Sequence, residues 1–466
     1  MKKALPVLLA YFLVVFATGC TRRLKEGSTD DHYEGSPNII FLLTDDQRWD
    51  ALGCMGNPIV RTPNIDALAN QGLLFKNAYV TTSICCISRA SILSGQYESR
   101  HRINDFNTDF SPAAWARTYP MLLKNAGYKI GYINKFGVGT HPPAGSFDYW
   151  KCPNGEQPPY EMKRSDGTII HNTDSAANDI KIFLDKFGTQ QPFCLSVGFK
   201  APHEQDGTPP RFIPQDRYMN MYSDIIIPEP ATADPIYWNR FPTFFRTAQN
   251  IARQRWRDML STDKLFQQSV KNYYRLISGV DEVVGNLMQQ LKELDIDRHT
   301  VIIYMGDNGM FLSEHGLEGK WYGLEESIRV PMIVYDPLLS DQQRTGIEEQ
   351  IALNVDIAPT ILSIAGLPIP DRMQGKNLLS IANGSVAPRK EFFYEHTYQS
   401  SPVIPQTEGV VTPDFKYLRY IENGYEQLFN VQTDRYETTN LAFNPTYHDK
   451  LLEMRKRYEA LKKSVQ

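Results

Sequence analysis

Residues 37–46 have the sequence PNIIFLLTDD, a continuous apolar run that ends abruptly at Thr44, Asp45 and Asp46. A short run of this kind, rich in β-branched and large apolar side chains, predicts a strand that is buried on both faces of a sheet. Similar runs occur at Tyr128–Ile133, Pro192–Val197 and Thr300–Met305. The chain therefore has several candidate strands for the interior of one sheet.

Helical patterns separate these runs. Between Tyr273 and Leu294, apolar residues recur every three or four positions and form one stripe, which predicts a helix packed on the sheet. Strands that alternate with helices indicate an α/β fold with a parallel sheet covered on both faces. Ligands in such folds bind beyond the carboxyl ends of the strands. We therefore expect Asp45 and Asp46 to lie at the functional edge of the sheet.

The chain has 466 residues, of which 42% are hydrophobic and 22% charged, and its formal net charge is -4. This length fits one large domain and a smaller one, and the charge gives no reason to expect nucleic acid as a partner. After about Leu379 the helix–strand alternation weakens, and aromatic strands and an amphipathic helix follow. We predict a main domain at 37–385, with a long irregular insertion at 204–260, and a C-terminal subdomain at 386–466.

The N-terminal residues predict export. A positive start precedes the apolar run Ala4–Phe16, which is too short for a membrane span, and small residues precede Cys20. We predict a signal peptide of lipoprotein type at 1–20, with plain signal cleavage as the alternative, and a flexible tether at 21–36. The protein would then lie in the periplasm or at the cell surface and contact the membrane only through a lipid anchor.

Two polar pairs each follow directly on a predicted strand. Asp45-Asp46 ends the first strand and Asp307-Asn308 follows the last one. Oxygen ligands from two strand ends suit Ca²⁺ or Mg²⁺ better than zinc, and zinc-type CxxC spacing is absent from the sequence. The alternative is that each pair only caps a helix or forms a turn. The residues alone leave both interpretations open.

Residues 83–95, SICCISRASILSG, form a Ser/Cys cluster that begins a helix. Cys85 would lie near the helix N-terminus, where the dipole and free N–H groups favour negative charge. Arg89 lies one turn later and can face the same anion. The alternative is that Cys85 and Cys86 are small buried side chains that pack the helix start. An export route permits a disulfide between Cys152 and Cys194, although their spacing does not demand one.

With these motifs the chain resembles the type I sulfatase family of the alkaline-phosphatase-like superfamily. That family carries Cys-x-Pro-Ser-Arg, and Cys85, Ser88 and Arg89 fall into register. Further matches are Leu93 and Gly95, Pro63–Ala69, Glu314–Lys320, Glu325–Pro331, Asp356–Thr360 and Glu437–Ala442. The resemblance covers nearly all of residues 37–445. It implies a large mixed, mostly parallel sheet flanked by helices, with a smaller C-terminal α+β subdomain.

The resemblance also implies a mechanism. A maturation enzyme would oxidise Cys85 to formylglycine, whose hydrate attacks the sulfate ester and forms a covalent enzyme sulfate. One Ca²⁺, with Mg²⁺ as the alternative, would be held by Asp45, Asp46, Cys85, Asp307 and Asn308. The sulfate would be clamped by Arg89, Lys135 and Lys320. The leaving alcohol would receive a proton from His203.

Two positions depart from the family's pattern. Ile87 stands where the family has proline, so the efficiency of Cys85 conversion is an open question. Gly137 stands where the family has a histidine two residues after Lys135. His141 lies close by in the sequence, as a candidate replacement or an ordinary loop residue.

We therefore expect a sulfuric ester hydrolase that acts on sulfated saccharides. Candidate substrate-binding residues are His315, Arg100 and His101, and the insertion and Glu395-His396 could line sugar subsites; each could equally be structural. Three alternatives stay open: an arylsulfatase, a phosphoester hydrolase of the same superfamily, and a non-catalytic glycan-binding protein whose Cys85 is never converted. The phosphoester hydrolases with two metals need extra His and Asp ligands that the sequence does not supply.

Overall fold

An eight-stranded sheet in the order β14-β2-β13-β9-β1-β8-β4-β5 forms the centre of the fold in the computed structural model. The structure describes residue 1 and residues 35–466 except 154–156, 165, 191 and 399. The strands are β1 (Asn38–Asp45), β2 (Leu73–Phe75), β4 (Lys129–Asn134), β5 (Tyr149–Lys151), β8 (Phe193–Pro202), β9 (Thr300–Gly306), β13 (Met332–Tyr335) and β14 (Gly346–Glu348). The four predicted strands are β1, β4, β8 and β9, which are mutually parallel.

The sheet is mixed because β13 runs antiparallel to both of its neighbours, β9 and β2. Every residue of β1 is buried, as its continuous apolar sequence predicted. Ile39, Phe41 and Leu43 belong to one hydrophobic core, whereas Ile40 and Leu42 belong to a second. Successive side chains of a strand point to opposite faces, so β1 anchors a core on each side of the sheet.

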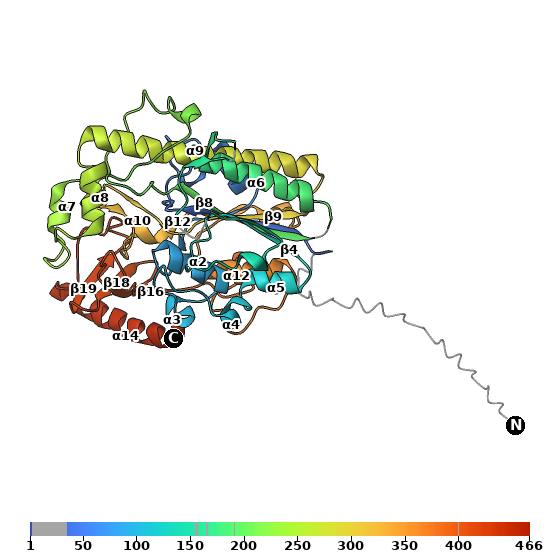
Figure 1. Ribbon diagram of the computed structural model, residues 1–466. Helices are drawn as coiled ribbons and strands as arrows, with labels where there is room; N and C mark the ends of the chain where they lie inside the picture. Colours follow the sequence, from blue (N-terminus) through green and yellow to red (C-terminus); the bar gives the residue numbers. More distant parts are fainter. Residues whose placement is uncertain (2–34, 154–156, 165, 191, 399) are drawn as a thin grey trace. The chain divides into compact units, whose positions relative to one another are not determined.

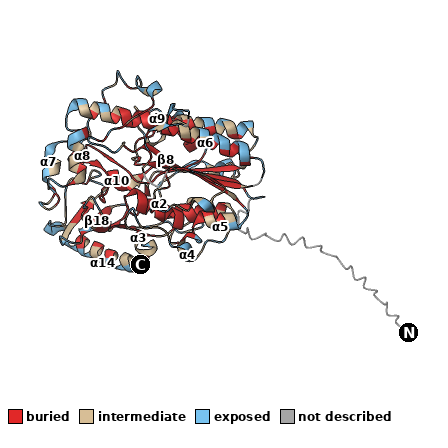
Figure 2. Cartoon of the chain, viewed as in Figure 1, coloured by how far each residue is buried: buried red, intermediate tan, exposed pale blue. Residues whose placement is uncertain are grey.

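Helices cover both faces of the sheet (Figure 1). On one face lie α6 (Asn172–Phe187) and α9 (Asp263–Glu293), and on the other lie α2 (Cys85–Ser94), α5 (Tyr119–Asn125) and α12 (Ile357–Ile364). The predicted stripe from Tyr273 to Leu294 falls in α9 and its C-cap residue Leu294, and the inner face of this helix is buried whereas its outer face is exposed (Figure 2). α9 begins ten residues earlier than the stripe, where Thr262 Oγ1 accepts a hydrogen bond from Leu265 N at 3.3 Å.

A four-stranded antiparallel sheet follows near the C-terminus. Its strands are β16 (Phe392–His396), β17 (Thr407–Val411), β18 (Phe415–Tyr420) and β19 (Tyr425–Asn430), and α14 (His448–Val465) packs on it. The expectation of a mixed sheet with a smaller C-terminal α+β part is confirmed. The insertion at 204–260 is irregular, as expected, and contains α7 (Pro235–Asn239) and α8 (Ile251–Met259).

Shorter elements complete the chain. The short helices are α1 (Pro63–Asn70), α3 (Glu98–His101), α4 (Pro112–Trp115), α10 (Glu325–Ile328), α11 (Asp341–Arg344) and α13 (Leu378–Ala382). One small sheet has three strands, β12 (Arg329–Val330), β3 (Ala78–Tyr79) and β15 (Ala352–Leu353). Two others have two strands each, β6 (Glu161–Lys163) with β7 (Ile169–His171), and β10 (Phe311–Leu312) with β11 (Glu318–Gly319). Cys152 and Cys194 are free thiols, so the disulfide that the sequence allowed is not formed.

The predicted signal peptide at 1–20, including Cys20, and most of the tether at 21–36 lie outside the described residues. Among the residues that the structure does describe, no helix is long and apolar enough to cross a membrane.

Candidate active site

The two polar pairs meet at the carboxyl edge of the main sheet. β1 and β9 are adjacent and parallel, with Leu43 opposite Met305 and Thr44 opposite Gly306, so both pairs leave the sheet at the same level. The backbone of Asp46 turns into the left-handed region (φ 59°), and its N–H donates to Asp307 Oδ1 at 3.0 Å. Asn308 Nδ2 donates to Asp46 Oδ1 at 2.5 Å.

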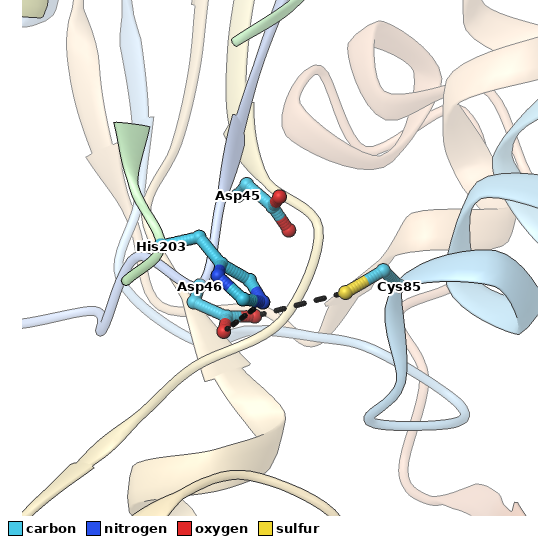
Figure 3. A group of neighbouring side chains, drawn as sticks. All are labelled: Asp45, Asp46, Cys85 and His203. Atoms are coloured by element: carbon cyan, nitrogen blue, oxygen red, sulfur yellow. Dashed lines mark hydrogen bonds and ion pairs between the residues drawn. The ribbon is translucent and has the colours of Figure 1, made fainter. Parts of the chain in front are cut away.

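Cys85 is the first residue of α2 and points at this acidic edge (Figure 3). Its side chain is only 2% exposed, and Sγ lies 3.9 Å from Asp46 Oδ1 and 3.1 Å from Lys320 Nζ. Burial, together with Asp45, raises the pKa of the thiol well above its ordinary value. An unmodified Cys85 is therefore a protonated and weakly nucleophilic group.

Three buried cations surround the carboxylates. Arg89 Nε donates to Asp307 Oδ2 at 2.8 Å. Lys135 Nζ is ion-paired with Asp45, and Lys320 Nζ with Asp46. The lysines and Arg89 are 5% exposed or less. One arginine, two lysines and three carboxylates thus face one another without bulk water.

These contacts shift the pKa values of the acids in different directions. Burial raises the pKa of Asp45, but Lys135, His203 and Arg89 outweigh it and hold that pKa well below its ordinary value. Burial, reinforced by Asp45, raises the pKa of Asp307 to about 7. Packing several carboxylates together has a cost that a bound cation would relieve.

His203 directly follows β8, and its ring lies against the Asp46 carboxylate that Cys85 also faces (Figure 3). Its Nε2 is 3.4 Å from Asp46 Oδ2, and its Nδ1 is 2.6 Å from the Glu204 carbonyl oxygen. Because a carbonyl oxygen only accepts, Nδ1 carries the hydrogen and Nε2 faces the site. Burial and then Lys320 lower the pKa of His203 well below its ordinary value.

The residues of this cluster fit a divalent metal ion. Ligand atoms of Asp45, Asp46, Cys85 and His203 lie within 4.8 Å of one another. Asp45 Oδ1 and Asn308 Oδ1 are buried and have no hydrogen-bond partner among the described residues. Buried oxygens of this kind are uncommon unless an ion or water completes them, and a donor set rich in carboxylates suits a hard cation.

Other sequence candidates lie in different surroundings. His315 is buried among Tyr237, Phe241 and Phe311, and burial lowers its pKa to about 4. His101 is held by Ser91 Oγ at 3.0 Å and by the Ile103 N–H at 3.1 Å.

Arg100 lies beside His101 in α3, away from the hydrogen bonds and ion pairs of the acidic edge, and its Nε has no hydrogen-bond partner among the described residues. His396 is completely buried at the end of β16, next to Glu395. His141 is exposed and its Nδ1 lies 2.8 Å from Asp109 Oδ2, so the structure does not bring it into the buried cluster.

The surroundings of Gly137 leave no room for a side chain. This residue has φ +74°, and a Cβ added there would lie 2.9 Å from Arg89 Cδ. A side chain at this position would therefore displace Arg89 or strain the backbone.

Several residues near the cluster were not among the sequence candidates. Gln157 Nε2 donates to Asp45 Oδ2 at 3.3 Å, and Tyr273 OH donates to the Asp46 carbonyl oxygen at 2.8 Å. Lys200 and Glu204 are completely buried and flank His203 in the sequence. The sequence did contain a signal for them, because two charged residues stand within the Lys-Ala-Pro-His-Glu segment at the end of a buried strand, where charge is uncommon.

Comparison with known families decides the assignment. The model of the sulfatase family matches residues 37–367. The chain belongs to the sulfatase family. A second model, described as the C-terminal part of N-sulphoglucosamine sulphohydrolase, matches residues 313–464 of this sulfatase. The family expected from Cys85, Ser88 and Arg89 is confirmed, and with it sulfuric ester hydrolysis as the enzyme class.

This sulfatase is similar over most of its length to proteins of known activity. It is 28% identical to an N-acetylglucosamine-6-O-sulfatase of Bacteroides thetaiotaomicron, with 92% of this chain and 86% of the relative covered. It is 26% identical to an arylsulfatase of Clostridium perfringens, with 90% and 93% covered. A solved complex of a protein with its substrate D-glucosamine-2-N,6-O-disulfate superposes with a TM-score of 0.79 at 27% identity, covering 92% and 98%.

Proposed function

We propose that this sulfatase hydrolyses sulfate esters on saccharides, using a formylglycine derived from Cys85 and one Ca²⁺. The observation that carries the proposal is the set of buried cations around Cys85: Lys320 contacts its Sγ, and Arg89 and Lys135 pair with Asp307 and Asp45 of the adjoining carboxylate cluster. The saccharide preference is supported by two similar proteins, one named as an N-acetylglucosamine-6-O-sulfatase and one solved with a sulfated glucosamine.

The charges of the cluster suit an anionic substrate. Three carboxylates and three fixed cations leave it close to neutral. Asp45, Asp46, Asp307 and Asn308 would hold Ca²⁺ together with the side chain at position 85, which makes the cluster net positive. A bound divalent cation cancels charge on the sulfate oxygens and lowers the proton affinity of a nearby hydroxyl.

The formylglycine hydrate supplies two hydroxyl groups, one to attack sulfur and a second whose proton loss lets sulfate leave. Arg89 of α2 and Lys135, which follows β4, would orient the sulfate, and Lys320 would contact it beside position 85. Since these cations are already fixed by ion pairs, they need little reorganisation as charge develops on the sulfate oxygens.

His203 would donate a proton to the leaving alcohol through Nε2. The hydrogen bond from Nδ1 to the Glu204 carbonyl holds the ring so that Nε2 faces the site. The negative charge of the substrate raises the pKa of a neighbouring imidazole, so the ring can carry the proton when sulfate is bound. A sugar alcohol is a poor leaving group, and its departure depends on that proton.

The decisive test combines activity with mass spectrometry. The chain is produced in a host with a sulfatase-maturation enzyme, and free sulfate is measured on 6-sulfated, 2-sulfated and N-sulfated glucosamines and on 4-nitrophenyl sulfate. We expect a higher kcat/KM on a sugar sulfate than on the aryl ester. We also expect the peptide that contains Cys85 to have a lower mass, because conversion replaces the CH2–SH side chain with an aldehyde. Cys85→Ala should be inactive, whereas the matched variant Cys86→Ala, altered in the adjacent buried cysteine, should stay active.

Each alternative predicts a different result. A preference for the aryl ester would indicate an arylsulfatase, and a preference for phosphate esters would indicate a phosphoester hydrolase. An unmodified thiol with sugar binding but no turnover would indicate a glycan-binding protein. Ile87 is buried in the core beside Cys85, so comparing conversion in the wild type and in Ile87→Pro shows whether the maturation enzyme tolerates isoleucine.

We also propose that the chain is exported and anchored by a lipid at Cys20, with a signal at 1–20, a tether at 21–36, a catalytic domain at 37–385 and a C-terminal subdomain at 386–466. The support is the sequence of the first twenty residues. Detergent-phase partitioning of the mature protein tests the anchor. Cys20→Ser should move the protein from the detergent phase to the aqueous phase. A wild-type protein found in the aqueous phase would contradict lipidation.

A further inference from the structure

Helix α8 of the insertion brings one arginine to two completely buried carboxylates. Arg255 forms an ion pair with Glu204, and its Nη2 donates to Asp206 Oδ1 at 3.2 Å. Glu204 and Glu318 are both 0% exposed. The carboxylate oxygens of both acids lack a hydrogen-bond partner among the described residues, and burial raises the pKa of Glu318 to about 7, a shift that Arg255 opposes. Arg255 is therefore the ion-pair partner of Glu204 and lies close enough to Glu318 to act on its charge.

These two acids stand next to the proposed proton donor, His203, and next to Lys320. Glu204 directly follows His203, and its carboxylate Oε2 lies 3.6 Å from His203 Nδ1. Glu318 lies in β11, two residues before Lys320, and α8 packs against β11. Arg255 also lies 5.4 Å from the ring of Trp321, the residue after Lys320. One guanidinium thus contacts the surroundings of both His203 and Lys320.

The segment that carries His203 has few other restraints on its imidazole. Its backbone is held by His203 N–H donating to the Lys200 carbonyl at 3.0 Å and by Tyr160 OH donating to the His203 carbonyl at 2.6 Å. On the Nδ1 side, the ring contacts only Glu204, through its carbonyl and its carboxylate, among the contacts seen in the described residues. A Glu204 carboxylate left without Arg255 would be a buried, uncompensated charge beside the ring.

We propose that Arg255 is a positioning residue for leaving-group protonation: through its ion pair with Glu204 it fixes the orientation of the His203 ring. The inference rests on the proposed role of His203 as proton donor. It gives the insertion a task beyond lining the substrate, because its helix sets the geometry of the catalytic proton. Arg255 need not touch the substrate for this role.

The test compares two leaving groups in the matured, full-length protein. 4-Nitrophenol leaves readily without a proton, whereas the alcohol of a sugar 6-sulfate needs one. For Arg255→Ala we expect kcat on the sugar sulfate to fall about 10- to 100-fold, and kcat on 4-nitrophenyl sulfate to change less than about 3-fold. Arg255→Lys should recover part of the loss because it restores the charge.

Matched variants separate this role from a general loss of structure. Arg257→Ala removes an exposed arginine from the same helix and should leave kcat unchanged on both substrates. His203→Ala should reproduce the selective loss. If Arg255→Ala folds poorly, the double variant Arg255→Ala/Glu204→Gln also removes the uncompensated carboxylate, and it should recover part of the lost kcat on the sugar sulfate.

Two outcomes overturn the proposal. One is an equal loss on both substrates in Arg255→Ala. The other is a selective loss in His203→Ala with no loss in Arg255→Ala. A wild type inactive on both sulfate esters would instead overturn the proposed function, so the two failures are distinguishable.

Discussion

Gly137→Ala provides a sharp test of how Arg89 is held. The backbone at this position is left-handed, with φ +74°, which costs a residue with a Cβ about 1–2 kcal/mol. The added Cβ would also lie 2.9 Å from Arg89 Cδ and 3.3 Å from Nε. Such a contact must be relieved by movement, and overpacking of this kind costs about 1–3 kcal/mol more.

Arg89 has little freedom to yield. Its Nε is bonded to Asp307 at 2.8 Å and its Nη1 to the Lys135 carbonyl at 2.6 Å. On the far side, a Cβ at Gly198 would lie 2.7 Å from Nη1, so that glycine leaves room for the guanidinium and nothing more. We therefore expect Gly137→Ala to lower the free energy of unfolding by about 2–5 kcal/mol. A displaced Arg89 should also lower kcat/KM about 100-fold.

Gly366→Ala is the matched control. Gly366 has φ +69°, but a Cβ added to it would meet no atom of the described residues within 4 Å, so this substitution carries the backbone cost alone. Denaturant unfolding and sulfate release should be measured on both variants. The reasoning is refuted if Gly137→Ala unfolds at the same denaturant concentration as Gly366→Ala and retains wild-type activity.

Three further predictions concern the metal, the pH dependence of stability and a buried ion pair. Removing divalent cations with EGTA should abolish sulfate release, and calcium at about 100 times its Kd should restore it and stabilise the fold by about 2.7 kcal/mol in denaturant unfolding; magnesium restoring activity equally would contradict the calcium assignment. Burial and Glu98 raise the pKa of Glu395 to about 8, so the folded state keeps a proton that the unfolded chain loses near pH 4.5. Stability should therefore fall as the pH rises from about 4.5 to 8, by at most about 1.4 kcal/mol per pH unit from this group, and Glu395→Gln should flatten that decline in thermal melts at several pH values. Lys416 is completely buried between Glu325 (2.9 Å) and Glu437 (2.6 Å), so Lys416→Met should cost about 3–5 kcal/mol of unfolding free energy; an unchanged unfolding midpoint would mean that the acids are neutral in the native state.

The strand ends could be predicted because burial on both faces leaves a plain mark in the sequence. Continuous apolar runs identified β1 and β9, and the polar residues directly after them had to meet once the strands were adjacent and parallel. Lys135 and Lys320 carry no such mark. They come from distant connections, and only the family's pattern indicated that they converge on Cys85.

Other features depended on packing that a single sequence does not reveal. The contact of Gly137 with Arg89 depends on the path of a loop, and Arg255 meets Glu204 only because the insertion folds back over β11. His315 matched a family motif, yet its ring lies among aromatic side chains. A motif fixes the identity of a residue, whereas the direction of its side chain is decided by neighbours far along the chain.

The link between the C-terminal sheet and the start of α2 has a consequence for the timing of synthesis. Glu395 N–H donates to the Thr81 carbonyl at 2.9 Å, and Tyr394 OH lies 2.9 Å from Ser83 Oγ, across a sequence separation of 311 residues. At about 5–20 residues per second, a ribosome needs roughly a quarter of a minute to a minute to add the residues between these partners. During that interval the nascent chain cannot complete the wall around Cys85. Because the finished fold leaves only 2% of that residue exposed, an enzyme that alters the Cys85 side chain needs the chain before these contacts close.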